Sequence, residues 1–158
     1  MKRYFSILTF LISIAFLIHS CDIVDPPYIS NNNGGGDTEG LTKVLIEDYT
    51  GHGCVNCPGA AVTAESIQDV YGDQVVIMSV HAGFFATPNY GGNPLFADDF
   101  TTEAGDTWDT FFGISAAGNP NGMINRTPSS GNYILGPGSW PTAVSDLVGK
   151  PAYATLKI

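Results

Sequence analysis

The sequence predicts an α/β domain, and two observations carry this prediction. Two apolar runs of strand type, 43–49 and 74–80, flank a segment with helical periodicity at 58–70, which is the order of a β-α-β unit. The second run is almost continuously apolar, as expected of a strand inside a parallel sheet. The chain has 158 residues, about the length of one ordinary domain.

The β-α-β unit has clear local boundaries. Thr50 and Gly51 end the first strand, and Pro58 suits the first turn of the helix. Ala64 and Ile67 lie on one face of that helix, and Gly72 marks its end.

The elements after this unit are less regular. Segment 84–103 has no clear period, whereas 107–112 has the apolar face of a helix end. Segments 122–126 and 132–135 are predicted to pair as a hairpin across the turn between them. A closing helix is predicted at 139–148, with Ser139 as its N-cap.

Composition excludes two classes of protein. Fifteen acidic and six basic residues give a formal net charge of −9, so nucleic acid is not expected as a partner. Hydrophobic residues make up 44% of the chain and charged residues 13%, which excludes a polar disordered polymer.

Residues 1–20 have the pattern of a lipoprotein signal peptide. Two basic residues precede an apolar run at 4–18 that is too short to span a bilayer comfortably. The segment LIHSC at 17–21 resembles the lipobox of bacterial lipoproteins, which implies cleavage before Cys21 and acyl chains on that residue. Such chains anchor a protein to a membrane without a transmembrane helix. The alternatives are an ordinary signal peptide and a membrane helix with a chance cysteine.

Cleavage before Cys21 would explain the odd number of cysteines. Cys21 becomes the anchor, which leaves Cys54 and Cys57 as a pair. Four basic residues then remain against fifteen acidic ones, a net charge of −11. The protein is expected outside the cytoplasm, where disulfides persist.

Three regions follow the signal peptide in this interpretation. Residues 21–40 form a lipidated flexible tether, because they contain prolines, an Asn run and a Gly run and lack a hydrophobic period. Residues 41–150 form the folded domain. Residues 151–158 begin a new alternating strand, which we interpret as the start of a second, truncated domain.

The motif GHGCVNCP at 51–58 carries the chemistry. A CxxC between a strand and a helix places the first sulfur near the helix N-terminus, where the helix dipole favours a thiolate. The second cysteine lies close enough to resolve a mixed disulfide.

These features together resemble the thioredoxin superfamily. The superfamily has an acidic residue six positions before the first cysteine, here Asp48, and a cis-proline before the hairpin, here Pro120 after Asn119. The resemblance spans about 41–148 and implies a three-layer α/β/α sandwich with a central mixed sheet. The sequence departs from the pattern at Gly53, where tryptophan is usual, and in the insertion at 84–103.

A narrower resemblance includes the leader and the tether. Together with the segments LIEDYTGHGCVNCPGA, VHAG and GNPNGMINR, they are similar to the twenty-eight-kilodalton outer-membrane protein family of Bacteroidetes. This resemblance implies an outer-membrane lipoprotein, periplasmic or surface-facing, with a further C-terminal domain.

Specific roles follow from the thioredoxin resemblance. Cys54 is expected to be the exposed attacking thiolate, and Cys57 the buried resolving thiol. Asp48 is the candidate acceptor for the Cys57 proton, with its pKa raised by burial. The Asn119–Pro120 peptide is expected to be cis, with Pro120 in contact with one of the cysteines. The alternative for Asp48 is a side chain that faces solvent.

Two other uses of the cysteine pair remain open. Cys54, Cys57, His52 and His81 could form a zinc site, or the two sulfurs and one histidine a copper site, although the spacing is unusual. The pair could also be a structural disulfide. Our preferred interpretation includes no metal and no cofactor.

Several other residues have both an ordinary and a functional interpretation. His81 is expected at a strand end with a satisfied hydrogen bond, and Arg126 in a surface ion pair. Aromatic residues in and after the insertion favour packing, but could bind carbohydrate or peptide; they are Tyr90, Phe96, Phe100 and Trp108. The insertion itself could form a substrate-selecting lid.

Two functions therefore stand at this point. The first is a membrane-anchored thiol–disulfide oxidoreductase whose partners are the thiols or disulfides of exported proteins. The second is a non-enzymatic surface lipoprotein, an adhesin or binding component that retains the fold.

Overall fold

The computed structural model describes residues 40–154. The predicted signal peptide, Cys21 and nearly all of the tether lie outside the described residues, as does the end of the predicted final strand. Within residues 40–154, none of the helices has the length and apolar character needed to span a bilayer.

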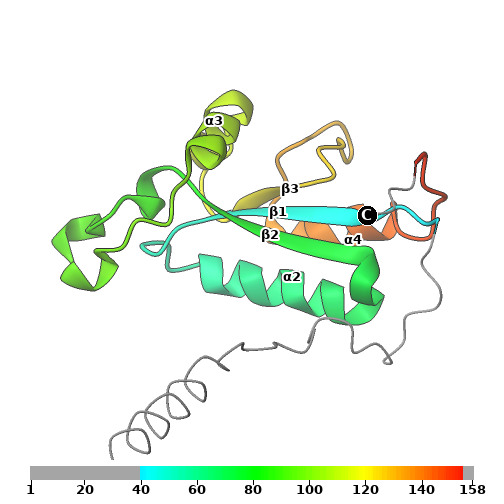
Figure 1. The fold of residues 1–158 in the computed structure, drawn as a ribbon, viewed down its shortest axis with the longest axis horizontal. Helices are drawn as coiled ribbons and strands as arrows, with labels where there is room; N and C mark the ends of the chain where they lie inside the picture. The colour runs from blue at the N-terminus through cyan, green and yellow to red at the C-terminus, as the bar shows by residue number, and fades with distance from the viewer. Residues whose placement is uncertain (1–39, 155–158) are drawn as a thin grey trace, which may run out of the picture. The chain divides into compact units, whose positions relative to one another are not determined.

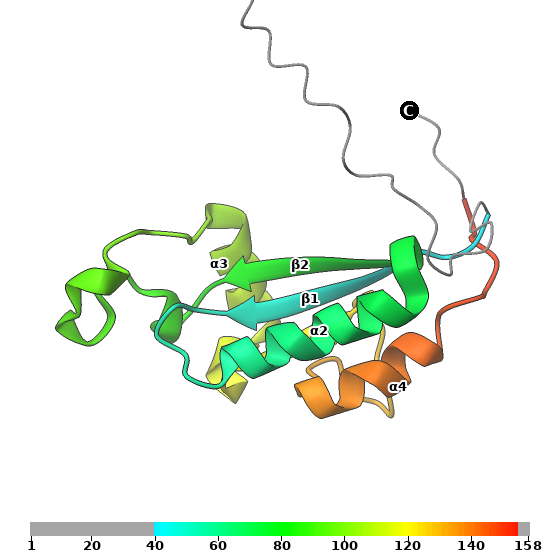
Figure 2. The same ribbon diagram turned by 90° about the horizontal axis from the view of Figure 1, so that it is seen from below.

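The β-α-β unit is present as the sequence predicts. Strand β1 (Val44–Thr50) leads to helix α2 (Cys57–Tyr71), and strand β2 (Val75–His81) pairs in parallel with β1 over its whole length. Each predicted boundary agrees with the structure to within one residue. The C-terminal end of β1 therefore lies beside the N-terminal end of α2 (Figure 2).

The sheet is mixed, with β1 at its centre. Strand β3 (Asn121–Ile124) pairs antiparallel with β1, which gives the strand order β2-β1-β3. The fold is thus α/β, as predicted. The remaining segments include short 3₁₀ turns at Gly72–Gln74, Phe84–Ala86, Tyr90–Gly92, Pro94–Phe96, Ser115–Ala117 and Pro137–Ser139.

The predicted hairpin is reduced to an isolated bridge between Gly122 and Leu135. The chain leaves β3 at Asn125, whose side-chain oxygen accepts a hydrogen bond from Leu45 N at 2.6 Å. Asn125 and Arg126 both have positive φ, so the backbone turns away before a second strand can form.

Two hydrophobic clusters pack against the sheet. The first joins β1 and β2 to α2 and to helix α4 (Trp140–Ser145), and includes Val44, Ile46, Ala60, Ala64, Ile67 and Trp140. The second joins the strands to helix α3 (Glu103–Phe112), and includes Tyr49, Val80, Met123, Trp108 and Phe112. Figure 1 shows α2 and α3 on opposite sides of β1 and β2.

Three predicted elements have different lengths in the structure. Helix α3 begins at Glu103, four residues earlier than predicted, because Thr102 caps it by accepting a hydrogen bond from Gly105 N at 3.0 Å. Helix α4 is shorter than the predicted 139–148. Residues 152–154 form no strand.

Candidate functional site

The two cysteines form a disulfide at the junction of β1 and α2. The Cys54 and Cys57 sulfur atoms are 2.07 Å apart and the two Cα atoms 5.4 Å apart. Backbone bonds shape the turn, since Cys54 N donates to Gly51 O and Cys57 N to Cys54 O. Cys57 is the first residue of α2, so the pair lies at the position that the motif predicts.

Both cysteines are buried, which corrects the expectation for Cys54. Cys54 is 6% exposed and Cys57 3% exposed, so only the second value agrees with the sequence-based prediction. Val55 between them is fully open to solvent.

The insertion packs against the loop that precedes Cys54. Gly53 N donates to Phe85 O at 2.9 Å, and a Cβ atom at Gly53 would lie 2.3 Å from the Tyr90 ring. A Cβ atom at Gly51 would lie 2.3 Å from the Phe85 carbonyl carbon. Glycine at these two positions is therefore what allows the insertion to pack closely against the loop before Cys54.

Aromatic rings hold the two histidines beside this loop. The His52 ring stacks on Phe96 with centroids 5.1 Å apart, and its Nε2 lies 3.0 Å from Thr87 O. The His81 ring lies 5.3 Å from Phe100. His81 Nδ1 is buried and has no hydrogen-bond partner among the described residues, so the expected satisfied bond is wrong for that atom. Burial, and to a lesser degree His52, lower the pKa of His81.

Asp48 is a buried carboxylate on the α2 side of β1. Its side chain alternates with Glu47 and points to the same side as Val44 and Ile46, which pack against α2. Asp48 is 1% exposed, and its Oδ1 has no hydrogen-bond partner among the described residues. Burial raises the pKa of Asp48 from 3.8 to about 6. The alternative that Asp48 faces solvent is wrong.

Glu47 is a second buried carboxylate, which the sequence analysis missed. Arg126 Nε donates to Glu47 Oε1 at 2.8 Å, and Tyr49 OH donates to Oε2 at 3.4 Å. The Arg126 guanidinium lies over the Trp108 and Phe112 rings, 4.8 and 5.3 Å from their centroids. An acidic residue inside an apolar strand was the available signal. Arg126 therefore pairs with a buried acid and not, as expected, with one at the surface.

Burial also affects the titration of the tyrosine beside Glu47. Burial first, and then the Glu47 carboxylate, raise the pKa of Tyr49 above its ordinary value. Tyr49 therefore stays protonated over the physiological range and serves as a donor to Glu47.

Pro120 follows a cis peptide bond, as predicted. Asn119 Nδ2 donates to Tyr49 O at 3.1 Å, which places the start of this loop at the C-terminal end of β1. The expected contact between Pro120 and a cysteine stays a prediction.

No described group of residues is arranged to hold a metal ion. Within residues 40–154, no cluster of three or more His, Cys, Asp or Glu side chains has suitable geometry. The zinc and copper alternatives are therefore not supported by this part of the chain, in which both sulfurs are joined in the disulfide.

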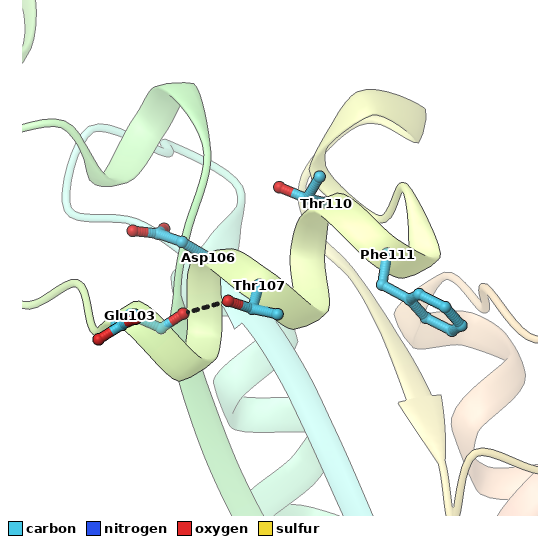
Figure 3. Close-up of a pocket in the computed structure, with 5 residues that line it drawn as sticks. All are labelled: Glu103, Asp106, Thr107, Thr110 and Phe111. Atoms are coloured by element: carbon cyan, nitrogen blue, oxygen red, sulfur yellow. Dashed lines mark hydrogen bonds between the residues drawn. The ribbon is translucent and has the colours of Figure 1, made fainter.

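One surface pocket lies on helix α3 and includes neither cysteine in its lining. Glu103, Asp106, Thr107, Thr110 and Phe111 line it, and Thr107 Oγ1 donates to Glu103 O at 2.7 Å (Figure 3). None of these residues belongs to the predicted site. The pocket therefore adds no chemistry to the CxxC turn.

Comparisons with models of protein families, with curated proteins and with solved structures found no match for this chain.

Proposed function

We propose that this protein is a lipid-anchored thiol–disulfide oxidoreductase of the cell envelope, with a thioredoxin-like domain, that exchanges disulfides with exported proteins. The observation that carries the proposal is Asp48. A buried carboxyl group with a raised pKa and an unpartnered oxygen lies two residues before the end of β1, on the side of the sheet that α2 covers. Strongly shifted acids in such positions are typical of proton-transfer sites.

The topology supports the finer fold assignment in this proposal. A parallel β-α-β unit is followed by an antiparallel strand on the other side of β1, and the two hydrophobic clusters involve different helices. An isolated bridge joins Gly122 to Leu135, where the sequence predicts the second strand of a hairpin. We therefore propose that the domain is a three-layer thioredoxin-like sandwich. From the sequence resemblance described above, we also propose that the protein belongs to the twenty-eight-kilodalton outer-membrane protein family.

The exchange reaction begins from the disulfide form. A substrate thiolate attacks Cys54 Sγ, the Cys54–Cys57 bond breaks, and Cys57 leaves as a thiolate. A second substrate thiolate then attacks the substrate sulfur of the mixed disulfide. Cys54 leaves, so that the substrate is oxidised to a disulfide and the protein is reduced to a dithiol. The reverse sequence reduces a substrate disulfide.

Asp48 supplies or accepts the proton for Cys57 in this scheme. When Cys57 leaves as a thiolate in a buried site, protonated Asp48 can donate to it. In the reverse direction the Asp48 carboxylate accepts the proton before Cys57 attacks. A pKa of about 6 keeps both forms of Asp48 accessible near neutral pH, which is the requirement for such a shuttle.

The burial of Cys54 favours a second candidate function. Cys54 is only 6% exposed, so that its sulfur is poorly accessible to a protein substrate in this conformation. A non-enzymatic surface lipoprotein with a structural disulfide accounts for this burial directly. The two candidates differ in whether Cys54 forms mixed disulfides.

Trapping of mixed disulfides tests the enzymatic proposal. A Cys57→Ser variant is expected to accumulate mixed disulfides with exported proteins through Cys54, because the resolving thiol is missing. The matched Cys54→Ser variant is expected to trap few. Equal trapping by both variants, or none by either, would overturn the assignment and favour the non-enzymatic candidate.

The membrane anchor has its own test. The precursor is expected to be cleaved between Ser20 and Cys21 and to incorporate a palmitate analogue at Cys21. A Cys21→Ser variant should lose the label and fractionate away from membranes. Label retained by that variant would contradict the proposed anchor.

A further inference from the structure

Large apolar side chains that are open to solvent lie in the CxxC turn and in the insertion that packs against the loop before it. Val55 lies between the cysteines, and the insertion contributes Phe84, Leu95 and Phe100. Their exposed fractions range from 55% to 92%. We call these four side chains the apolar rim. Exposed apolar side chains gathered beside a reactive group indicate an interaction site more often than chance.

Ring contacts hold two of the four rim side chains in position. The Phe84 ring lies 5.5 Å from Phe85 and 5.2 Å from Tyr90, whose own ring packs on Gly53 next to Cys54. Phe100 lies against His81 at 5.3 Å. These contacts fix Phe84 and Phe100, two of the rim side chains, within the segment that packs against the loop before Cys54.

The charge beside the rim is negative. The insertion at 84–103 contains three acidic residues, Asp98, Asp99 and Glu103, and no lysine or arginine. Asp98 and Asp99 are exposed and directly precede Phe100. Hydrogen bonds from the Thr101 backbone and side chain lower the pKa of Asp99, so that it stays ionised. An apolar surface flanked by carboxylates is complementary to a partner that is both apolar and cationic.

We propose that the apolar rim docks an extended polypeptide segment with apolar and positively charged side chains around its cysteine. This inference rests on the proposed function and names the substrate class for it. A polypeptide is favoured over a membrane surface because the acidic flank repels anionic lipid, whereas a polypeptide can provide both the cationic groups and the reacting sulfur.

Binding of an unreactive peptide tests docking without any redox step. The probe is a labelled peptide of alternating Leu and Lys around a central Ser, which replaces the reacting Cys. Two matched peptides replace Lys by Glu or Leu by Ser. With the full chain in its disulfide form, we expect the Leu/Lys peptide to bind at least about tenfold more tightly than either matched peptide at low salt.

Variants of the rim locate the binding surface. The double variant Phe84→Ser/Leu95→Ser is expected to weaken binding of the Leu/Lys peptide by about tenfold or more, because each side chain loses a buried apolar contact. Val70→Ser is the matched control, since Val70 is also exposed but lies at the far end of α2. Asp98→Asn should weaken the same peptide, and Asp69→Asn on α2 should not.

The outcomes separate this inference from the proposed function. Equal affinity for the Lys and Glu peptides, or unchanged binding by the rim variant, would overturn the docking proposal. Binding to neutral lipid vesicles that the rim variant loses, without peptide binding, would overturn it in favour of a membrane. Retained peptide binding together with no mixed-disulfide trapping by Cys57→Ser would leave the docking surface standing and refute the oxidoreductase alone.

Discussion

Two neighbouring residues of β1 carry buried carboxyl groups that differ in whether they have hydrogen-bond partners. Glu47 and Asp48 are each 1% exposed, and strand alternation sends them to opposite sides of the sheet. Glu47 has Arg126 and Tyr49 as partners. Asp48 Oδ1 has no partner among the described residues, and burial raises the pKa of its carboxyl group to about 6.

The difference separates a structural acid from a candidate functional one. Burying a carboxylate is unfavourable unless it is paired, and Glu47 meets this condition through a guanidinium that also rests on two aromatic rings. Asp48 does not meet this condition, because its Oδ1 has no partner among the described residues. Asp48 lies on the side of the sheet that is covered by α2, the helix that begins with Cys57. A role in proton transfer is the simplest explanation for an unpaired acid that is unfavourable to bury.

Loss of the Glu47–Arg126 pair is expected to have the largest effect on stability. Arg126→Gln should lower the free energy of unfolding by about 3 kcal/mol, because the buried Glu47 carboxylate loses its partner. Urea unfolding measures this change. The double variant Glu47→Gln/Arg126→Gln should recover a large part of the loss. A loss below about 0.5 kcal/mol, the size of a surface pair, would contradict the structural role of Glu47.

The next effect tests Asp48 through the pH dependence of stability. Because the pKa of Asp48 is higher in the folded state than its ordinary 3.8, the folded state retains a proton that the unfolded chain has already released. Stability contributed in this way is complete below about pH 4 and is lost as pH rises through about 6. The change amounts to at most about 3 kcal/mol.

Asp48→Asn should remove this component of the pH dependence. Urea unfolding at several values between pH 4 and pH 7.5 compares the two proteins, with Asp69→Asn as an exposed control. Parallel pH profiles for the wild type and Asp48→Asn would show that Asp48 titrates normally.

The smallest change in stability is expected for an ion pair at the surface, which serves as a contrast to the buried Glu47–Arg126 pair. Lys43 Nζ lies 3.5 Å from Asp73 Oδ2, and both side chains are largely exposed. Asp73→Asn should change the free energy of unfolding by less than about 0.5 kcal/mol, because water screens the pair. A loss as large as that of Arg126→Gln would mean that burial does not distinguish the two pairs.

Local sequence signals predicted the β-α-β unit well. Apolar runs, Pro58 in the first helical turn and Gly72 at the helix end are short-range signals, and the structure follows them. They were enough to place Cys57 at the start of α2 and Asp48 in the preceding strand. The burial of Asp48 followed from the family spacing, since alternation alone could not decide between it and Glu47.

The features that the sequence did not predict depend on contacts between distant segments. Tyr90 and Phe85 pack on the loop directly before the buried Cys54, and no local pattern indicates that approach. Arg126 reaches Glu47 across 79 positions of the chain. The second hairpin strand is absent because the backbone turns away at Asn125 and Arg126, where φ is positive, and the Asn125 side chain bonds to Leu45 of β1.

The most direct test of the central claim is the rate at which dithiothreitol reduces the Cys54–Cys57 disulfide, measured from pH 4.5 to 8 in the wild type and Asp48→Asn. The rate of the wild type divided by the rate of Asp48→Asn is independent of the ionisation of dithiothreitol, because both proteins meet the same reagent. We expect this ratio to fall by at least about tenfold as pH rises through about 6, because Asp48 then no longer donates a proton to the leaving Cys57. Glu47→Gln changes a residue on the opposite side of the sheet. The rate of the wild type divided by the rate of Glu47→Gln should therefore be independent of pH. A wild-type to Asp48→Asn ratio that does not change with pH would contradict the claim that Asp48 serves the cysteine pair.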